Sequence, residues 1–166
     1  MKFEDLVTRA LRIGERLKAR GETVAVGESS AGGLISAALL SVPGASAYFL
    51  GGAVVYTQRA RKTIAGIERE QVEGMRSSSE PYAALLARSS RERMRATWGL
   101  SETGASGPTG NSYGDAAGHS CIAVSGPVER VITLETGHGD RLENMYRFAD
   151  AALALLEQAL EVPVPA

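Results

Sequence analysis

The fold is decided by the stretch TVAVGESSAGGLISAALL, residues 23–40. Its first four residues form a short apolar run, partly β-branched, and predict a buried strand. Residues 27–33 are small and include three glycines, which predicts a tight loop. Residues 34–40 then predict a helix that begins directly at this loop. A strand, a loop and a helix in this order indicate an α/β protein.

The elements on either side of this stretch alternate in the same way. Apolar residues at helical spacing predict a helix over residues 4–20. Residues 47–50 are expected to begin a short helix, and residues 53–56 to form a strand. A further helix is expected over residues 59–64, because the threonine ahead of it is a good N-cap.

The second half of the chain continues the alternation. Ser79-Glu80-Pro81 is a typical helix start, because serine caps the first turn and proline fits inside it. Three more elements are expected: strands over residues 120–124 and 131–135, joined as an antiparallel hairpin, and a long helix over residues 140–160. No repeat or linker divides the chain, so we expect a single α/β domain over residues 1–166.

Composition and charge narrow the possible functions. The chain has 166 residues, a net charge of −1 and 5% aromatic residues, which argues against a nucleic-acid partner. It has one cysteine and two histidines, so we expect neither a disulfide nor a metal site. We find no run of about 18 apolar residues and no signal peptide, and we therefore expect a cytoplasmic protein without a membrane partner.

Two glycine-containing segments carry the expected chemistry. The first glycine bend is residues 28–33, and the second glycine bend is residues 103–110. Backbone N–H groups at a helix start are unpaired, so they suit an anion or a developing oxyanion. Two such bends in one α/β domain indicate a shared ligand cleft, although each bend alone is equally typical of a tight turn or a surface connection.

These segments belong to a longer series of short motifs. The first bend, ESSAGG, is similar to a family pattern ESCTGG, and PGASA at residues 43–47 is similar to GSSA. Three later stretches also match: GAVVYT at residues 52–57 resembles GFVTYS, TGASGP at residues 103–108 resembles SGIAGP, and residues 139–141 read GDR. The matches follow one another in order along nearly the whole chain. The sequence therefore resembles the C-terminal domain of the CinA family of competence/damage-inducible proteins, also known as nicotinamide-nucleotide amidases.

The resemblance implies a mixed sheet flanked by helices, and hydrolysis of the carboxamide of nicotinamide mononucleotide to the acid and ammonia. It implies no cofactor and no metal, a small-molecule mononucleotide as the partner, and a homo-oligomer. The family's nucleophilic serine falls on Ser46 and its tyrosine on Tyr56. The ligand-binding positions implied by the two bends and the GDR motif are Glu28, Ser29, Ser30, Gly32, Gly33, Thr103, Gly104, Ser106, Gly107 and Arg141.

One departure from the family pattern concerns the chemistry directly. The family's lysine falls on Arg61, and an arginine stays protonated, so it cannot serve as the base that activates a serine. Lys62 follows directly and would take over if the helix start shifted by one residue. Two functions therefore stay open: an amidohydrolase that uses Ser46 and Tyr56, and a nucleotide-binding module without turnover.

Overall fold

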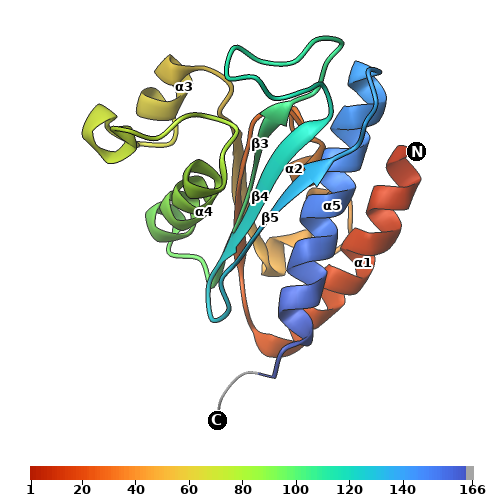
Figure 1. Cartoon of the computed structure of the whole chain (residues 1–166). Coiled ribbons are helices and arrows are strands. Elements are labelled where there is room, and N and C mark those ends of the chain that lie inside the picture. Colours follow the sequence, from red (N-terminus) through yellow and green to blue (C-terminus); the bar gives the residue numbers. More distant parts are fainter. Residues whose placement is uncertain (164–166) are drawn as a thin grey trace.

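Five strands form one mixed sheet in the computed structural model, which describes residues 1–163 (Figure 1). The strand order is β2-β1-β3-β4-β5. β1 pairs in parallel with both β2 and β3, whereas β4 pairs antiparallel with both β3 and β5. The strands are β1 (Val24–Glu28), β2 (Phe49–Val54), β3 (Trp98–Ala105), β4 (His119–Ser125) and β5 (Arg130–Glu135). The expected α/β fold and the hairpin of the last two strands are confirmed.

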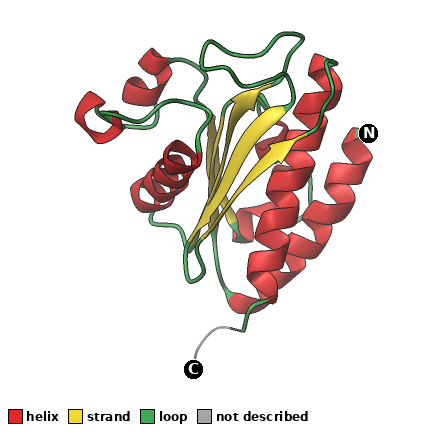
Figure 2. Cartoon of the chain, viewed as in Figure 1, coloured by secondary structure: helices red, strands yellow, loops and turns green. Residues whose placement is uncertain are grey.

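Helices cover both faces of the sheet (Figure 2). The helices on one face are α1 (Phe3–Arg20), α2 (Leu34–Leu40) and α5 (Arg141–Glu161), and the opposite face carries α4 (Glu80–Met94), with α3 (Gln58–Thr63) beside it. The larger core lies under the first group and buries Tyr48, Trp98 and Phe148 completely. None of the helices in the described part of the chain is both long and apolar enough to cross a membrane.

The helix ends follow the capping residues in the sequence. The side chains of Thr57, Ser79 and Asp140 each accept a hydrogen bond from a backbone N–H of the first turn of α3, α4 and α5. Helix α1 ends at Gly21, whose φ of 64° is a left-handed conformation that glycine adopts without strain. These caps explain why the helix predictions are confirmed to within two residues at most ends.

The edge strand β2 differs from the prediction. The short helix expected at residues 47–50 is wrong: a 3₁₀ turn covers Ala45–Ala47, and the strand begins at Phe49. The strand also runs through Gly51 and Gly52 and ends at Val54, whereas we expected a strand over residues 53–56. Both positions are crowded, because a Cβ would lie 2.7 Å from the Met94 side chain at Gly51 and 2.0 Å from Ser36 at Gly52. Glycine is present here for packing and does not mark a turn.

The central strand β3 was not predicted at all. Its middle residues Ser101, Glu102 and Thr103 are polar, so the segment lacks the apolar pattern of a buried strand. All three are nevertheless buried, and each has hydrogen-bond partners inside the fold. The second glycine bend therefore begins as strand, since β3 extends to Ala105.

Candidate functional site

A cleft lies at the carboxyl ends of β1, β2 and β3. The parallel pairing of β1 with both neighbours brings these three strand ends to the same edge of the sheet. Open α/β sheets place their ligands at such an edge. The cleft has a volume of about 330 Å³, and its wall consists of Ser29, Val55, Tyr56, Thr57, Gln58, Arg61, Ser77, Ser78, Tyr82, Thr103, Gly104 and Tyr113. It is therefore lined by hydroxyl groups, one guanidinium and a smaller apolar part.

The first glycine bend uses its N–H groups internally. The carboxylate of Glu28, which is fully buried, accepts hydrogen bonds from the backbone N–H groups of Gly33, Ile35 and Ser36 at 2.8, 3.2 and 2.9 Å. It also accepts one from the Ser36 hydroxyl at 2.7 Å. Glu28 thus caps helix α2 from the end of β1. In this structure a side chain of the protein occupies the N–H of Gly33, the donor that we expected to face a ligand.

A second buried carboxylate closes the rest of this bend. Glu102 of β3 accepts the N–H groups of Ser29 and Ala31 at 3.1 and 2.8 Å and the Ser30 hydroxyl at 2.5 Å. Ser120 of β4 adds a hydroxyl at 3.2 Å. Glu28 and Ser30, two of the expected ligand-binding positions, are buried, and their polar groups are paired within the fold. Only Ser29 of this bend lines the cleft.

Burial controls the ionisation of this second carboxyl. Its complete burial raises the pKa of Glu102 above the usual range, while the bonds from Ser30, Ala31 and Ser29 lower it in part. The neighbouring charge of Glu28 acts in the same direction as burial. The pair of carboxyls under the first bend is therefore held by many donors, and ionisation of Glu102 is penalised.

The second glycine bend is held from outside by α5. Asn144, which is fully buried, donates hydrogen bonds to the carbonyl oxygens of Ser106 and His138 at 2.8 and 2.7 Å. Its own carbonyl accepts the Thr136 hydroxyl at 2.6 Å. Side chains fix this bend from behind, so the surface of Thr103 and Gly104 that faces the cleft stays open.

Arg141 joins the second bend to the end of β2. One Nη donates to the carbonyl of Gly107, and the other donates to the Tyr56 hydroxyl at 3.2 Å. Three of the predicted site residues therefore meet at this point. Ser106 lies in the same segment but is buried, and its hydroxyl has no hydrogen-bond partner within residues 1–163. Gly32, by contrast, packs toward α5, since a Cβ there would lie 2.7 Å from Met145.

Arg61 supplies the positive charge of the cleft. It comes from α3 and lines both this cleft and a larger hollow beside it. Its Nε is buried and finds no hydrogen-bond partner within residues 1–163. The nearby Tyr82 hydroxyl stays protonated at neutral pH, because burial raises the pKa of Tyr82. The cleft thus combines an unsatisfied cationic donor with neutral hydroxyls.

Ser78 forms the floor between the second bend and α4. Its φ of 54° is unusual for a residue with a side chain, and its neighbours hold it there. Its N–H donates to the Thr103 hydroxyl at 3.2 Å, and its carbonyl oxygen lies 2.8 Å from His119 Nε2. Burial lowers the pKa of His119, but the bonds to Glu135 and Ser78 and the charge of Asp115 outweigh burial and raise it.

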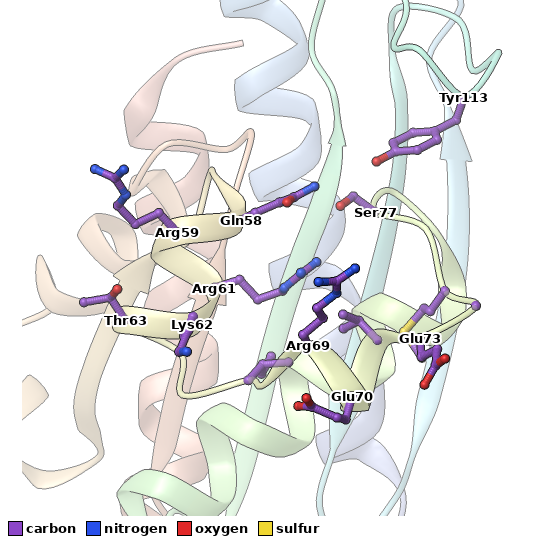
Figure 3. Close-up of a pocket in the computed structure, with 14 residues that line it drawn as sticks. Gln58, Arg59, Arg61, Lys62, Thr63, Arg69, Glu70, Glu73, Ser77 and Tyr113 are labelled. Atoms are coloured by element: carbon purple, nitrogen blue, oxygen red, sulfur yellow. The ribbon is translucent and has the colours of Figure 1, made fainter.

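The larger hollow of about 1080 Å³ lies between α3 and the loop that precedes α4 (Figure 3). Gln58 and Arg61 point into it from α3, across from Ser77 and Tyr113. These four residues also line the smaller cleft, so the two spaces adjoin.

Tyr113 is placed at this junction by a clasp between two loops. Arg76 forms two hydrogen bonds to the carboxylate of Asp115, and its guanidinium lies 5.5 Å from the centre of the Tyr113 ring. The backbone N–H of Tyr113 donates to Asn111 at 3.0 Å. The ring itself remains 47% exposed at the mouth of the cleft. It is therefore available to contact a ligand.

Two predicted catalytic residues do not join this cleft. Ser46 lies in the 3₁₀ turn ahead of β2, at the amino end of the strand, whereas Tyr56 follows its carboxyl end. The strand between them, Phe49–Val54, spans roughly 17 Å in five steps of about 3.3 Å, so the two residues lie beyond opposite ends of the strand. The Lys62 side chain is 71% exposed and pairs with Glu68 at 3.7 Å; it lines the larger hollow but not the cleft. One copy of the chain therefore brings together Ser29, Tyr56, Arg61, Thr103 and Gly104, with Arg141 next to Tyr56, but not Ser46 or Lys62.

Sequence reasoning missed the residues that hold the site together. Glu102, Asn144, His119 and Tyr113 had no assigned role, and their partners are distant in the sequence. Glutamate in a strand and asparagine on the apolar face of a helix are the local signals that indicate a buried polar group with fixed partners. Within residues 1–163, no group of three or more histidine, cysteine, aspartate or glutamate side chains is arranged to hold a metal ion.

A family model and the most similar relatives compared all indicate the same protein family. Residues 7–160 match the model of the CinA C-terminal domain. The CinA-like protein of Anaeromyxobacter sp. strain K is 39% identical over 145 residues, which cover 87% of this chain and 36% of that protein. The CinA-like protein of Salinibacter ruber is 35% identical over 156 residues, or 94% of this chain and 38% of that protein. The chain thus spans little more than a third of these relatives.

Solved structures show the same architecture. The competence/damage-inducible protein CihA of Agrobacterium tumefaciens is 29% identical and superposes with a TM-score of 0.85, covering 95% of this chain and 96% of that one. A competence-damaged protein superfamily member from Escherichia coli superposes with a TM-score of 0.86 at 23% identity, covering 95% and 90% of the two chains. At 23% identity, the similarity to the Escherichia coli protein shows a shared fold and nothing further.

Proposed function

Because this chain belongs to the CinA C-terminal domain family, we propose that it hydrolyses the carboxamide of nicotinamide mononucleotide, releasing ammonia, in the cleft at the carboxyl ends of β1, β2 and β3. The observation that carries this proposal is Arg61. Its buried Nε has no hydrogen-bond partner within residues 1–163, and the residue lines a cleft whose wall also carries hydroxyl groups. A buried guanidinium donor without an acceptor is costly, and a phosphate or carboxylate oxygen satisfies it.

The remaining wall suits the rest of such a ligand. The hydroxyls of Ser29, Ser78 and Thr103 offer donors and acceptors to a ribose and a carboxamide. Tyr113 offers an aromatic face to the pyridine ring. The positive charge of Arg61 and the hydroxyls of the wall also favour the negative oxygen that develops when a carboxamide carbon becomes tetrahedral.

The reaction requires a nucleophile and a proton acceptor. The family resemblance assigns the nucleophile to Ser46, whose oxygen would bond to the carboxamide carbon while the carbon–nitrogen bond breaks. The serine proton leaves with the nitrogen as ammonia, and water then releases the acid. Arg61 cannot accept the proton, so Tyr56, Lys62 or the substrate itself would carry it.

A nucleotide-binding module is the second candidate function. It is favoured by one observation: in a single copy Ser46 lies at the opposite end of β2 from Tyr56. In that case the cleft binds the mononucleotide through Arg61 and releases it unchanged.

Ammonia release from nicotinamide mononucleotide by the purified protein separates these functions. We expect activity that is lost in Ser46→Ala and Tyr56→Phe, and kept in Arg130→Ala at the far edge of the sheet. If Lys62 is the acceptor, Lys62→Ala also abolishes release. An inactive parent that gains activity in Arg61→Lys, together with a thermal shift by the mononucleotide in the parent, identifies a binding module instead.

A further inference from the structure

The buried imidazole of His119 has no role in the proposed reaction. His119 is the first residue of β4, it is 5% exposed, and it does not line the cleft. Its ring nevertheless contacts three separate segments of the chain. Nδ1 is hydrogen-bonded to the carboxylate of Glu135 on β5, and Nε2 lies 2.8 Å from the carbonyl oxygen of Ser78 and 3.7 Å from the carboxylate of Asp115. A change in the charge of this ring therefore acts on all three segments at once.

Both ring nitrogens of His119 face acceptors. The carbonyl oxygen of Ser78 can only accept a hydrogen bond, so Nε2 must donate to it. The ionised carboxylate of Glu135 also only accepts, so Nδ1 must donate as well. A neutral imidazole carries a single N–H, and only the imidazolium, with two, satisfies both contacts. Burial lowers the pKa of His119, but the bonds to Glu135 and Ser78 and the charge of Asp115 raise it overall, which favours the same charged form.

Further charged and titratable groups lie around the ring. The thiol of Cys121, 3.7 Å from Nε2, stays neutral at pH 7, because burial raises the pKa of this thiol. Glu80 of α4 adds a negative charge, since it accepts a hydrogen bond from the Thr133 hydroxyl, which also contacts Cys121. Arg76 is a cation, but two hydrogen bonds pair it with Asp115. Together with the partner on β5, three carboxylates and one guanidinium surround the ring, and their balance favours its charged form.

Ser78 connects this ring to the cleft. Its φ of 54° is a conformation that a residue with a side chain keeps only when its neighbours hold it. The ring of His119 holds its carbonyl oxygen, and its N–H donates to the Thr103 hydroxyl at 3.2 Å. Ser78 and Thr103 both line the cleft. Loss of the bond to the ring therefore lets Ser78 leave the left-handed conformation and withdraw its N–H from Thr103.

We propose that His119 is a positioning residue: its imidazolium holds Ser78 and Thr103 in place for the ligand and releases them when the ring loses a proton. The neutral ring keeps its proton on Nδ1, because a hydrogen bond to a carboxylate is stronger than one to a neutral acceptor. Nε2 then presents a lone pair to the carbonyl oxygen of Ser78, and the two repel each other. The wall of the cleft is therefore ordered at low pH and loosens as pH rises through the pKa of His119. The inference rests on the proposed function for the identity of the ligand.

The link between the ring and the cleft is tested on the protein without ligand. In an NMR pH titration, the ring of His119, identified by comparison with His119→Gln, and the amides of Ser78 and Thr103 should shift with one common midpoint. Glu135→Gln removes a charge at an exposed side chain and should lower this midpoint by about one pH unit. Glu129→Gln removes the same charge at the turn of the same hairpin and should leave the midpoint in place, because salt screens the longer distance.

Two results of this titration would overturn the inference. In the first, the amides of Ser78 and Thr103 do not follow the titration of the ring. In the second, Glu129→Gln lowers the midpoint as much as Glu135→Gln does.

Binding of nicotinamide mononucleotide, followed by calorimetry, tests the consequence for the ligand. The phosphate of the ligand also titrates, so the affinity of the parent is divided at each pH by that of His119→Gln, which has no titrating ring. We expect this ratio to fall about fivefold as pH rises through the midpoint, as for one lost hydrogen bond. In Glu135→Gln the fall should move to lower pH.

The two proposals fail in different ways. A constant ratio in a protein that binds the mononucleotide would refute the positioning role of His119 and leave the proposed function standing. Joint titration of the ring, Ser78 and Thr103 in a protein that binds no mononucleotide at any pH would refute the proposed function and support the link between His119 and the cleft.

Discussion

The two glycine bends have similar sequences of small residues, but the structure uses them in opposite ways. The first bend turns its N–H groups inward, onto the buried carboxylates of Glu28 and Glu102. The second bend is held from behind by Asn144 and Arg141, and its front lines the cleft. The protein's own carboxylates therefore occupy N–H groups of the first bend, whereas residues of the second bend line the cleft.

The largest expected effect is on the first bend. Glu102→Ala removes the acceptor of two N–H groups and two hydroxyls, all buried, and should lower the free energy of unfolding by about 4 kcal/mol. Glu102→Gln keeps the shape and one acceptor oxygen, and should lose less than about 2 kcal/mol. Urea unfolding at pH 7 measures both. Equal losses in the two variants would show that side-chain volume matters and the buried hydrogen bonds do not.

The difference in stability between the parent and Glu102→Gln should depend on pH, and the pKa of Glu102 gives the sign of that dependence. Because the pKa of Glu102 is raised in the folded state, its protonation stabilises the fold fully below the unfolded pKa, and this stabilisation is lost as pH rises through the folded pKa. The parent should therefore gain stability relative to Glu102→Gln as pH falls from 8 toward about 4.5. A difference that stays constant over this range would contradict a raised pKa.

The next effect concerns the second bend. Asn144→Ala leaves the carbonyls of Ser106 and His138 without their donor, and should cost about 3 kcal/mol. Hydrogen exchange should accelerate more at Gly118, next to the loosened bend, than at Ile35 of α2, whose N–H donates to Glu28. The exposed Gln158 on the same helix provides a control, since Gln158→Ala should change stability by less than about 0.5 kcal/mol. Equal acceleration at the two amides would indicate that Asn144 acts on the whole fold.

A smaller effect is expected at the mouth of the cleft. Tyr113→Ala should weaken binding of nicotinamide mononucleotide about tenfold, because one aromatic contact contributes about 1.4 kcal/mol. Binding of ribose 5-phosphate, which has no ring, should not change, and Tyr113→Phe should behave as the parent. Calorimetric titration distinguishes these cases. If Tyr113→Ala weakened the binding of both ligands equally, Tyr113 would not contact the pyridine ring.

The smallest effect belongs to the clasp that positions this ring. Arg76 lies at the surface and Asp115 is partly buried beside it, so a double-mutant cycle with Arg76→Ala and Asp115→Ala should give a coupling of about 0.5–1 kcal/mol at low salt. The bond to Arg76 lowers the pKa of Asp115, so this contribution is present above the unfolded pKa and is lost as pH falls through the folded pKa. Coupling that persists at pH 2 would show that the contact is not ionic.

The sequence predicted the elements whose signals are local. The helices α1 and α5 have regular apolar spacing and clear end signals, and both are confirmed. The prediction misplaced β2, because its two glycines are explained only by the packing of Ser36 and Met94 against them. It missed β3, because the polar residue Glu102 in that strand is explained only by the hydrogen bonds that it accepts from the bend at residues 29–31.

The same limit applies to the cleft. Individual positions such as Tyr56 and Thr103 could be singled out by motif, but the bond between Arg141 and Tyr56 joins residues 85 apart. Likewise, the carboxylate that occupies the first bend lies more than 70 residues from it. Such pairings follow from the strand order, which a single sequence with polar central strands does not reveal.

The direct test of the contrast between the two bends is an amide-resolved NMR titration with nicotinamide mononucleotide. The account predicts that the signals of Tyr56, Ser78 and Gly104 shift in a saturable way, while those of Gly33, Ile35 and Ser36 stay in place because Glu28 holds them. Saturable shifts centred on Gly33 and Ser36, with Gly104 unchanged, would contradict it.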